Sequence, residues 1–371
     1  MIKRIIAGSR ARFGALSLLV TAVRNIVSSF VFLAVSSVAF AAPLPKFPAG
    51  AVWNEDVSAP SMKHSNSDAM IGWLQSHGGW GTGLDQLQID FSMVVLHAEA
   101  DTPFVTMIGL GDDYYLPDCD VPGTVPFPLP VGGAIEGSSD YSCNIDDDDC
   151  HLLVVDGDQL YEAYRANRAS DGLQSQCAVR WDLNRVYPPE GRGDQCTSVD
   201  AAGFPVSALL FNADEIYDAI QSHGDIGHAI RFILPNDEMK ADVYVRPATH
   251  AGGPSNEDAD AIPYGSRFRL RADFDIDGFS SNEGVRALLR SLKKYGMLLA
   301  DGGNVPLTAE ADTFTTHKWD ELGMDSHSFF GIEPNDFEVV ETSAPIDLTY
   351  DCVRTPDEPP PDAIFANGFS D

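Results

Sequence analysis

Several catalytic signatures are missing from this sequence. Its 371 residues contain no G-x-S-x-G elbow, no H-E-x-x-H helix motif, no phosphate-binding loop and no dinucleotide fingerprint. These motifs place a nucleophile, a zinc ion or a phosphate at a fixed point of their folds. Their absence disfavours serine hydrolases of the elbow type, zincins and nucleotide-dependent enzymes.

Basic residues are scarce as well. The chain has 24 lysines and arginines against 55 aspartates and glutamates, a net charge of −31. Loss of residues 1–41 would leave 19 basic residues against the same 55 acidic ones, a net charge of −36. Such a chain repels phosphate polymers and anionic lipid surfaces, so we expect no nucleic-acid partner.

Long apolar runs are limited to the start of the chain. A run from Ile26 to Phe40 follows a segment with several arginines, and small residues stand at its end, at Ala39 and Ala41. This pattern predicts a signal peptide over residues 1–41. The run is shorter than the roughly 20 residues of a bilayer span, which favours cleavage over an uncleaved anchor. We therefore expect a secreted, periplasmic or outer-surface protein without an integral membrane span.

The six cysteines lack any C-x-x-C spacing. An even set in an exported chain favours disulfides over metal ligands, and six cysteines allow about 15 pairings. Closure of short loops favours Cys143 with Cys150 and Cys177 with Cys196, which leaves Cys119 with Cys352.

Apolar and polar residues alternate in many short segments, among them 89–98, 104–110, 151–156, 159–166, 177–183, 228–234, 241–247 and 337–342. Alternation with Gly, Pro and Asp clusters between segments predicts antiparallel strands, and Asp156-Gly157 predicts a hairpin turn. Helices are expected near 65–78, 213–224 and 280–296, with caps at Asp214 and Ser280. We predict one mainly β domain over 42–354, a jelly-roll-like antiparallel β-sandwich with a few short helices. An acidic, proline-rich tail follows over 355–371.

The segment RFRLRADFDIDGF, residues 267–279, allows two interpretations. Asp273, Asp275 and Asp277 are spaced as in an EF-hand loop, but position twelve of that loop is Gly284 instead of glutamate. Strict alternation from residue 267 to 277 favours a strand. In that strand Arg267, Arg269 and Arg271 would share a solvent-exposed charged face, either as an ion-pair ladder or as a surface for an extended hydroxyl-rich ligand.

Motifs spread over most of the chain resemble a family of exported bacterial proteins with no established activity. They are, in order, CHLLVVDGDQLYEAY, TSVDAAGFPV, GHAIRFILP, RPATHAGG, YGSRFRLRADFDI and LKKYGMLLADGG. The closing DAIFANGFSD resembles a short terminal signature of exported proteins of gram-negative bacteria. The resemblance implies one uninterrupted domain and a gram-negative source. It identifies no catalytic residue.

Residues suited to proton transfer or ligand binding occur at the ends of predicted strands. We select Asp214, Glu215, His228, His250 and Asp156 as candidate catalytic residues, and His151, Arg231, Arg246, Arg267, Arg269 and Arg271 as candidate substrate-binding residues. For most of them a structural role, such as a helix cap, a turn or a hydrogen-bonded histidine, is an open alternative. A sugar-stacking set is also open: Trp73, Trp80, Trp181, Trp319, Tyr114, Tyr115, Tyr161 and Tyr164.

We expect no cofactor and no catalytic metal. Asp146 to Asp149 offers hard oxygen ligands for a structural calcium, but adjacent residues cannot all point at one ion, so a solvated acidic loop is favoured. The leading hypothesis is an exported protein that hydrolyses a neutral polysaccharide. The alternative is a non-catalytic module that binds an extracellular glycan or cell-surface polymer. A polysaccharide lyase is third, and a peptidase is weaker still.

Overall fold

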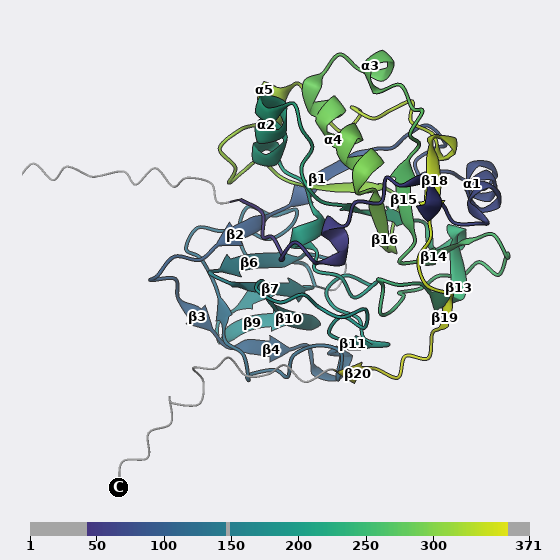
Figure 1. Ribbon diagram of the computed structural model, residues 1–371. Coiled ribbons are helices and arrows are strands. Elements are labelled where there is room, and N and C mark those ends of the chain that lie inside the picture. The colour runs from purple at the N-terminus through teal and green to yellow at the C-terminus, as the bar shows by residue number, and fades with distance from the viewer. Residues whose placement is uncertain (1–42, 146–148, 355–371) are drawn as a thin grey trace, which may run out of the picture. The chain divides into compact units, whose positions relative to one another are not determined.

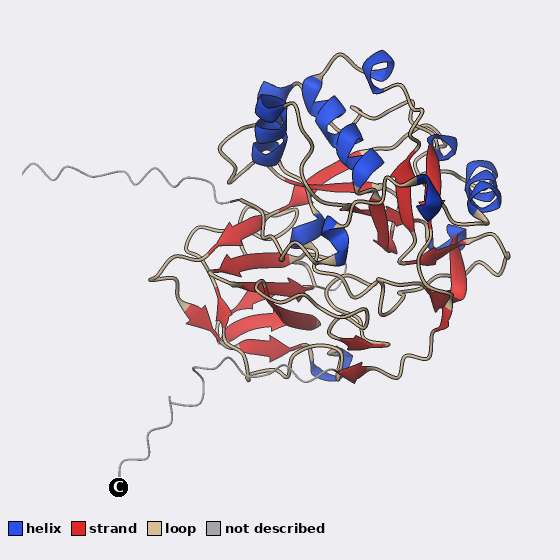
Figure 2. Cartoon of the chain, viewed as in Figure 1, coloured by secondary structure: helices blue, strands red, loops and turns tan. Residues whose placement is uncertain are grey.

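Strands prevail over helices in the computed structural model, which describes residues 43–145 and 149–354 (Figures 1 and 2). The predicted signal peptide, the tail over 355–371 and Asp146 to Asp148 of the acidic loop lie outside the described residues. The mainly β class is confirmed. A jelly-roll-like sandwich is not, because the described strands divide among six sheets of two to six strands.

A six-stranded mixed sheet forms the larger part of the fold. Its order is β1 (Ile89–Met93), β17 (Leu307–Glu310), β12 (Ile230–Leu234), β16 (Met297–Gly302), β15 (Arg267–Leu270) and β18 (Phe337–Val340). The pairs β1/β17 and β12/β16 are parallel, and the other neighbours are antiparallel. Parallel neighbours need long crossover connections, which alternation along one segment does not reveal.

The helices α2 (Ala213–Ser222) and α4 (Glu283–Lys294) pack against each other beside this sheet (Figure 1). The predicted apolar stripe of α4 is buried, including Val285, Leu288 and Leu292. Both predicted caps are wrong by two residues. Asn212 caps α2 and Asn282 caps α4, since their side chains accept backbone N–H bonds that Asp214 and Ser280 do not. The predicted first helix is α1 (Ser67–Ser76), which packs on β18.

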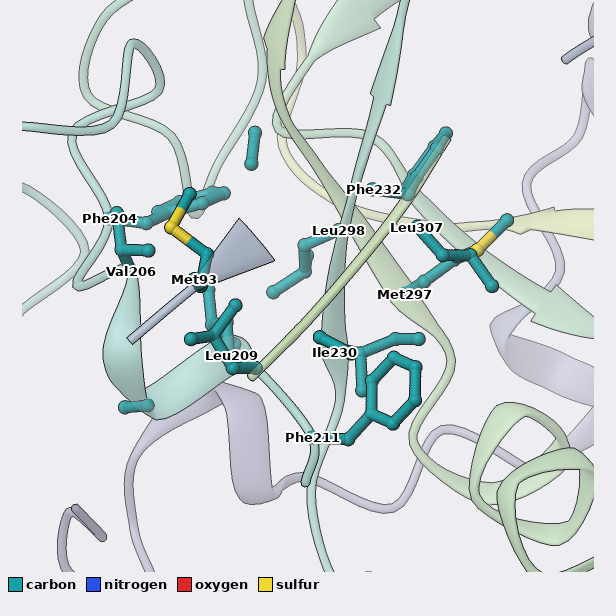
Figure 3. Close-up of a cluster of buried hydrophobic side chains, with 14 of the residues drawn as sticks. Met93, Phe204, Val206, Leu209, Phe211, Ile230, Phe232, Met297, Leu298 and Leu307 are labelled. Carbon is teal, nitrogen blue, oxygen red and sulfur yellow. The ribbon is translucent and has the colours of Figure 1, made fainter. Parts of the chain in front are cut away.

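A four-stranded sheet has the order β10 (Cys177–Asp182), β7 (Gln159–Tyr164), β6 (Leu152–Asp156) and β2 (Val95–His97). The hairpin between β6 and β7 is confirmed, and Asp156 pairs with Gln159 across a turn at Gly157 and Asp158. The segment predicted as one strand over 89–98 divides at Val94, so that β1 and β2 belong to different sheets. Apolar side chains such as Met93, Phe204 and Leu298 form one buried cluster beside that junction (Figure 3).

The remaining elements are short. The small sheets contain β3 (Phe104–Val105), β4 (Met107–Gly109), β5 (Phe127–Pro128), β8 (Asn167–Ala169), β9 (Gly172–Ser175), β11 (Gly193–Asp194), β13 (Met239–Tyr244), β14 (Ile262–Tyr264), β19 (Ile346–Asp347) and β20 (Val353–Arg354). The short helices are α3 (Ile276–Phe279), α5 (Trp319–Leu322), η1 (Val52–Asn54), η2 (Pro60–Met62), η3 (Gly111–Asp113), η4 (Ser207–Leu209), η5 (Asn236–Glu238) and η6 (Pro334–Asp336).

The charged strand predicted over 267–277 is corrected in two ways. Only β15 is extended, and all four of its residues are buried. Arg267 donates to the carbonyls of Tyr295 at 2.7 Å and Glu55 at 2.9 Å, so it does not belong to a wet face. The chain then turns, and Asp275 caps the one-turn helix α3. Within 43–145 and 149–354, no group of three or more His, Cys, Asp or Glu side chains is arranged to hold a metal ion.

All six cysteines form disulfides. Cys143 pairs with Cys150 as expected, but Cys119 pairs with Cys177 and Cys196 with Cys352, so the other two predicted pairings are wrong. Three disulfides are consistent with an exported protein. Among the helices of the described residues, none combines the length and the apolar character that a bilayer crossing requires.

Candidate functional site

A pocket of about 580 Å³ collects polar side chains from distant parts of the chain. We call it the Asp301 pocket. Its walls come from the segment after η3, the residues before β6, the end of β7, the 197–201 loop, the segment after β13 and the end of β16. The lining residues are Tyr114, Tyr115, Leu116, Asp118, Asp149, His151, Tyr164, Thr197, Ser198, Val199, Ala201, His250, Gly252, Asp301, Gly302 and Tyr350.

Asp301 lies near the carboxyl end of β16, beside the parallel strand β12. Its Oδ1 accepts the N–H of Gly302 at 2.7 Å, and Oδ2 lies 3.4 Å from the N–H of Ala201. Removal from water raises the pKa of Asp301 to about 6, and the neighbouring Asp200 carboxylate acts in the same direction. The side chain is still 32% exposed, so this carboxyl group can reach a ligand in the pocket.

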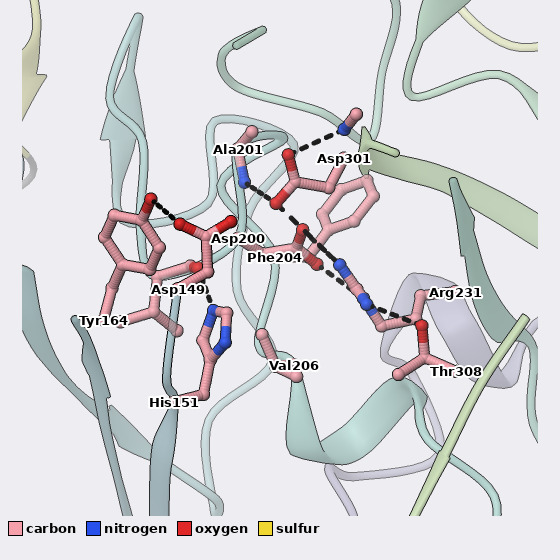
Figure 4. A network of polar contacts seen from close by, with 12 residues as sticks. Asp149, His151, Tyr164, Asp200, Ala201, Phe204, Val206, Arg231, Asp301 and Thr308 are labelled. Atoms are coloured by element: carbon pink, nitrogen blue, oxygen red, sulfur yellow. Dashed lines mark hydrogen bonds and ion pairs between the residues drawn. The ribbon is translucent and has the colours of Figure 1, made fainter. Parts of the chain in front are cut away.

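An ion pair beneath the pocket holds Asp301 in place (Figure 4). Arg231 of β12 donates twice to Asp200, at 3.2 and 3.0 Å, and once to the hydroxyl of Thr308 at 2.9 Å. A guanidinium nitrogen also lies 3.9 Å from Asp301. Burial acts to lower the pKa of Arg231, but the two aspartates outweigh it and raise the pKa, so the guanidinium stays charged. Arg231, predicted to bind substrate, lies beneath the pocket and forms an ion pair with buried Asp200.

His151 lies at the floor of the same pocket, and both nitrogens of its ring have hydrogen-bond partners. Its Nδ1 donates to Glu136 at 2.6 Å and its Nε2 to the carbonyl of Val199 at 3.0 Å. Burial opposes the charged imidazole, but the Glu136 carboxylate outweighs burial and raises the pKa of His151 to about 9. The ring is therefore a buried cation with both nitrogens engaged. It supports the pocket and has no nitrogen left for substrate.

His250 differs from His151, because only one nitrogen of its ring has a hydrogen-bond partner among the described residues. Its Nδ1 is 2.9 Å from the carbonyl of Ala201, which fixes the tautomer with the proton on Nδ1. Among the described residues, Nε2 has no hydrogen-bond partner. Burial lowers the pKa of His250, so the ring is neutral at pH 7 and presents a basic nitrogen. The predicted catalytic residue His250 thus lines the same pocket as Asp301.

Tyrosines supply the apolar walls. The hydroxyl of Tyr114 donates to the Asp120 carbonyl at 2.6 Å, and that of Tyr164 to Asp149 at 2.8 Å. Tyr350 is 61% exposed at the rim. Of the predicted stacking set, Tyr114, Tyr115 and Tyr164 line this pocket. Tyr161 and the four tryptophans of that set do not.

A second polar group contains three residues at the start of the described chain and around α2. Glu215 lies between Lys46 at 3.2 Å and His228 at 3.4 Å. The pKa of buried Glu215 is lowered: burial raises it, but His228 and Lys46 outweigh burial. His228 and Lys46 line a cavity of about 360 Å³ that Glu215 does not line. The structure therefore brings together two predicted catalytic residues, Glu215 and His228, at a place separate from the Asp301 pocket.

The remaining predicted site residues have structural partners. Asp214 accepts backbone N–H bonds from Thr316 and His317, and Asp156 ends β6 at the hairpin. The arginines are held by neighbours as follows: Arg246 by Asp194, Arg267 by main-chain carbonyls, Arg269 by Glu338 and Arg271 by Asp273. None of these side chains lines the Asp301 pocket.

Sequence reasoning missed Asp301, Asp118 and Asp149 as pocket residues. One signal for Asp301 was present, since MLLAD ends an apolar strand with a carboxylate directly before Gly302 and Gly303. Ligand sites in open sheets lie at the carboxyl ends of parallel strands, which is where Asp301 lies. Nothing local marks Asp118, because the disulfide of the adjacent Cys119 and the contacts of its loop bring it to the pocket.

Among protein-family models, curated proteins and solved structures, none matches this chain. The likeness to exported bacterial proteins therefore depends on the quoted sequence motifs alone. Functional inference starts from the geometry of the site.

Proposed function

We propose that this protein is an exported hydrolase of a neutral, hydroxyl-rich polymer, with a polysaccharide as the leading substrate class and the Asp301 pocket as its active site. One observation carries the proposal. A carboxyl group with a raised pKa and a neutral histidine with an unoccupied nitrogen line one pocket that also has tyrosine walls. A perturbed acid and base in a concave site are the usual marks of proton-transfer chemistry.

Asp301 is the general acid in this proposal. Cleavage of a glycosidic bond requires a proton on the leaving oxygen, and a carboxyl group with a raised pKa is the usual donor. With a pKa of about 6, Asp301 is partly protonated in mildly acidic solution. Its backbone hydrogen bonds from Gly302 and Ala201 hold the carboxyl group in one orientation and leave it accessible from the pocket.

His250 is the general base. Its Nε2 takes a proton from the attacking water, while Nδ1 stays bonded to the Ala201 carbonyl and holds the ring. In a second version of the mechanism, His250 only orients the water. Asp149, which also lines the pocket, is then the second carboxylate that a glycosidase needs. Replacement of each residue separately distinguishes these roles.

The pocket favours a neutral ligand over an acidic one. None of the described residues that line it is a lysine or an arginine, and three are aspartates. The one cation at the floor, His151, is already paired with Glu136. A uronate would therefore meet net negative charge, and the lyase alternative lacks a cation to neutralise the sugar carboxylate.

The test is incubation of the secreted chain with neutral and acidic glycans, followed by assays for new reducing ends and for unsaturated products. We expect reducing ends from a neutral glycan and a loss of about 10²- to 10⁴-fold in kcat for Asp301→Asn and His250→Gln. Asp218→Asn, on the exposed face of α2, is the control. Retention of a glycan without turnover would support the binding module, and activity unchanged in both variants would refute this active site.

A further inference from the structure

A second cavity, of about 400 Å³, has a different character. We call it the Trp53 pocket. Four aromatic side chains, Trp53, Trp181, Tyr187 and Phe204, and three prolines, Pro188, Pro189 and Pro247, form part of its wall beside small, aliphatic and charged residues. The Trp181 and Tyr187 rings meet edge to face at 5.0 Å. Aromatic-lined grooves of this kind recognise proline-rich segments in the polyproline II conformation.

Trp53 adds an unmet hydrogen-bond donor. The side chain is only 7% exposed, and its indole N–H has no hydrogen-bond partner in the described part of the chain. A buried donor without a hydrogen-bond partner lowers the free energy of unfolding by about 1 to 3 kcal/mol. A polyproline II segment makes no internal hydrogen bonds, so its carbonyls are free to accept from such a group. Trp53 lines both this pocket and the cavity of about 360 Å³, and its indole nitrogen is itself buried, so a ligand carbonyl reaches this donor only if the ring shifts.

The end of the described chain lies beside this pocket. In the antiparallel pair β11/β20, Asp194 pairs with Val353 and Gly193 with Arg354. If this pairing continued, residue 356 would lie opposite Gly191, which lines the Trp53 pocket. Arg246, also in the lining, donates to Asp194 at 2.9 Å. The strand β20 is therefore directed toward the pocket, and Asp194, its partner residue on β11, accepts from the lining residue Arg246.

The sequence that follows is Thr355-Pro-Asp-Glu-Pro-Pro-Pro-Asp362. We propose that Pro359 to Pro361 of this chain's own tail occupy the Trp53 pocket and that Trp53 donates to a tail carbonyl. The five residues from Arg354 to Pro359 span up to about 17 Å, more than the roughly 7 Å from Gly193 to Gly191. The lining contains two arginines, Arg246 and Arg267, that would attract the acids of the tail, and two glutamates, Glu55 and Glu341, that would repel them.

Because the tail is covalently attached to the domain, weak contacts are sufficient to keep it docked in the pocket. A short tether gives an effective concentration on the order of 1 mM, so a segment whose free peptide binds with Kd of about 0.1 mM would be docked about ten times more often than not. This proposal does not depend on the enzymatic role of the Asp301 pocket.

The test uses the full chain with photoreactive benzoylphenylalanine in place of Asp362. Cross-links to residues of the Trp53 pocket are expected, and the same group at Asn367 should give fewer. Trp53→Phe keeps the ring and removes the donor, and should lower the cross-link yield at least threefold. Replacement of Pro359 to Pro361 by glycine should do the same without any change to the pocket.

Two controls make the result decisive. A urea melt shows whether Trp53→Phe still folds, and the glycine variant answers the question if it does not. Mixing isotopically heavy and light chains separates docking within one molecule from docking between two. Cross-links scattered over the surface, cross-links only between molecules, or a yield unaffected by the three glycines would each overturn the proposal.

Discussion

Asp301→Asn should make the folded protein more stable at pH 7, whatever its effect on the proposed activity. The reason is that ionised Asp301 is unfavourable in the fold, where its pKa is raised from 3.8 to about 6 by removal from water and by Asp200. Asparagine keeps an oxygen for the N–H groups of Gly302 and Ala201 but carries no charge.

The magnitude follows from the shift. An acid whose pKa is higher in the folded state is protonated in both states below pH 3.8, so it has no effect on stability there. Between pH 3.8 and about 6 the unfolded chain ionises first, and stability falls as pH rises. Above about pH 6 the full penalty is present, at most about 3 kcal/mol for this shift. Because the side chain is 32% exposed, we discount this to about 1 to 2 kcal/mol.

The assay is urea unfolding of both proteins at pH 7 and pH 3.5, with Asp218→Asn as a control for loss of one negative charge from an acidic surface. We expect Asp301→Asn to gain about 1 to 2 kcal/mol over the control at pH 7 and nothing at pH 3.5. A gain of the same size at both values, or no gain at pH 7, would refute the argument that Asp301 is held in an unfavourable environment.

Three further results are expected. Replacement of both Cys196 and Cys352 by serine opens a loop of 156 residues and should lower the free energy of unfolding by about 5 kcal/mol, and mass mapping of unreduced digests should recover this pair. Arg231→Ala leaves the buried Asp200 carboxylate unpaired and should cost about 3 to 5 kcal/mol in urea melts, and adding Asp200→Asn should restore part of it. Burial raises the pKa of Glu310 from 4.5 to about 8, so stability should fall as pH rises between these values, and Glu310→Gln should flatten that dependence.

Local structure was largely readable from the sequence. The β6/β7 hairpin and the helix α4 follow from short-range signals, an Asp-Gly turn in one case and an apolar stripe in the other. The caps were misplaced because Asn, Asp and Ser all accept N–H bonds well, and Asn282 stands two residues after Ser280. Where two suitable capping residues lie close together in the sequence, the packing of the helix decides which of them caps it.

Long-range pairing was not readable. A preference for short loops predicted Cys143 with Cys150 correctly, but it failed for Cys177, whose partner is Cys119. The segment around Cys119 bonds along the start of β10, where Tyr115 donates its N–H to the carbonyl of Gln176, just before the strand, and Asp120 donates its N–H to the carbonyl of Ala178. These contacts bring the two sulfurs together, and no spacing between cysteines encodes them.

The same limit applies to the site. His250 was selected because it follows a predicted strand, but its partner Asp301 lies 51 positions away and meets it only through the Ala201 loop, which contacts both. Strand ends carry many Asp and His residues in this acidic chain. Pocket membership depends on the sheet order, which local alternation does not specify.

The charged alternation of β15 shows where periodicity fails as a guide to exposure. Period two tells which side chains share a face, but not that the face is wet. Here the segment from Val52 to Ala59 covers the arginine side of β15, and its carbonyls accept from Arg267 and Arg269. An arginine has five donors and can satisfy several main-chain carbonyls at once, so a buried face of arginines is stable where lysines, with three donors each, would leave carbonyls without a donor. The six-stranded sheet is therefore buried on both sides at β15, so the arginine face is not the exposed ligand surface predicted from the alternation.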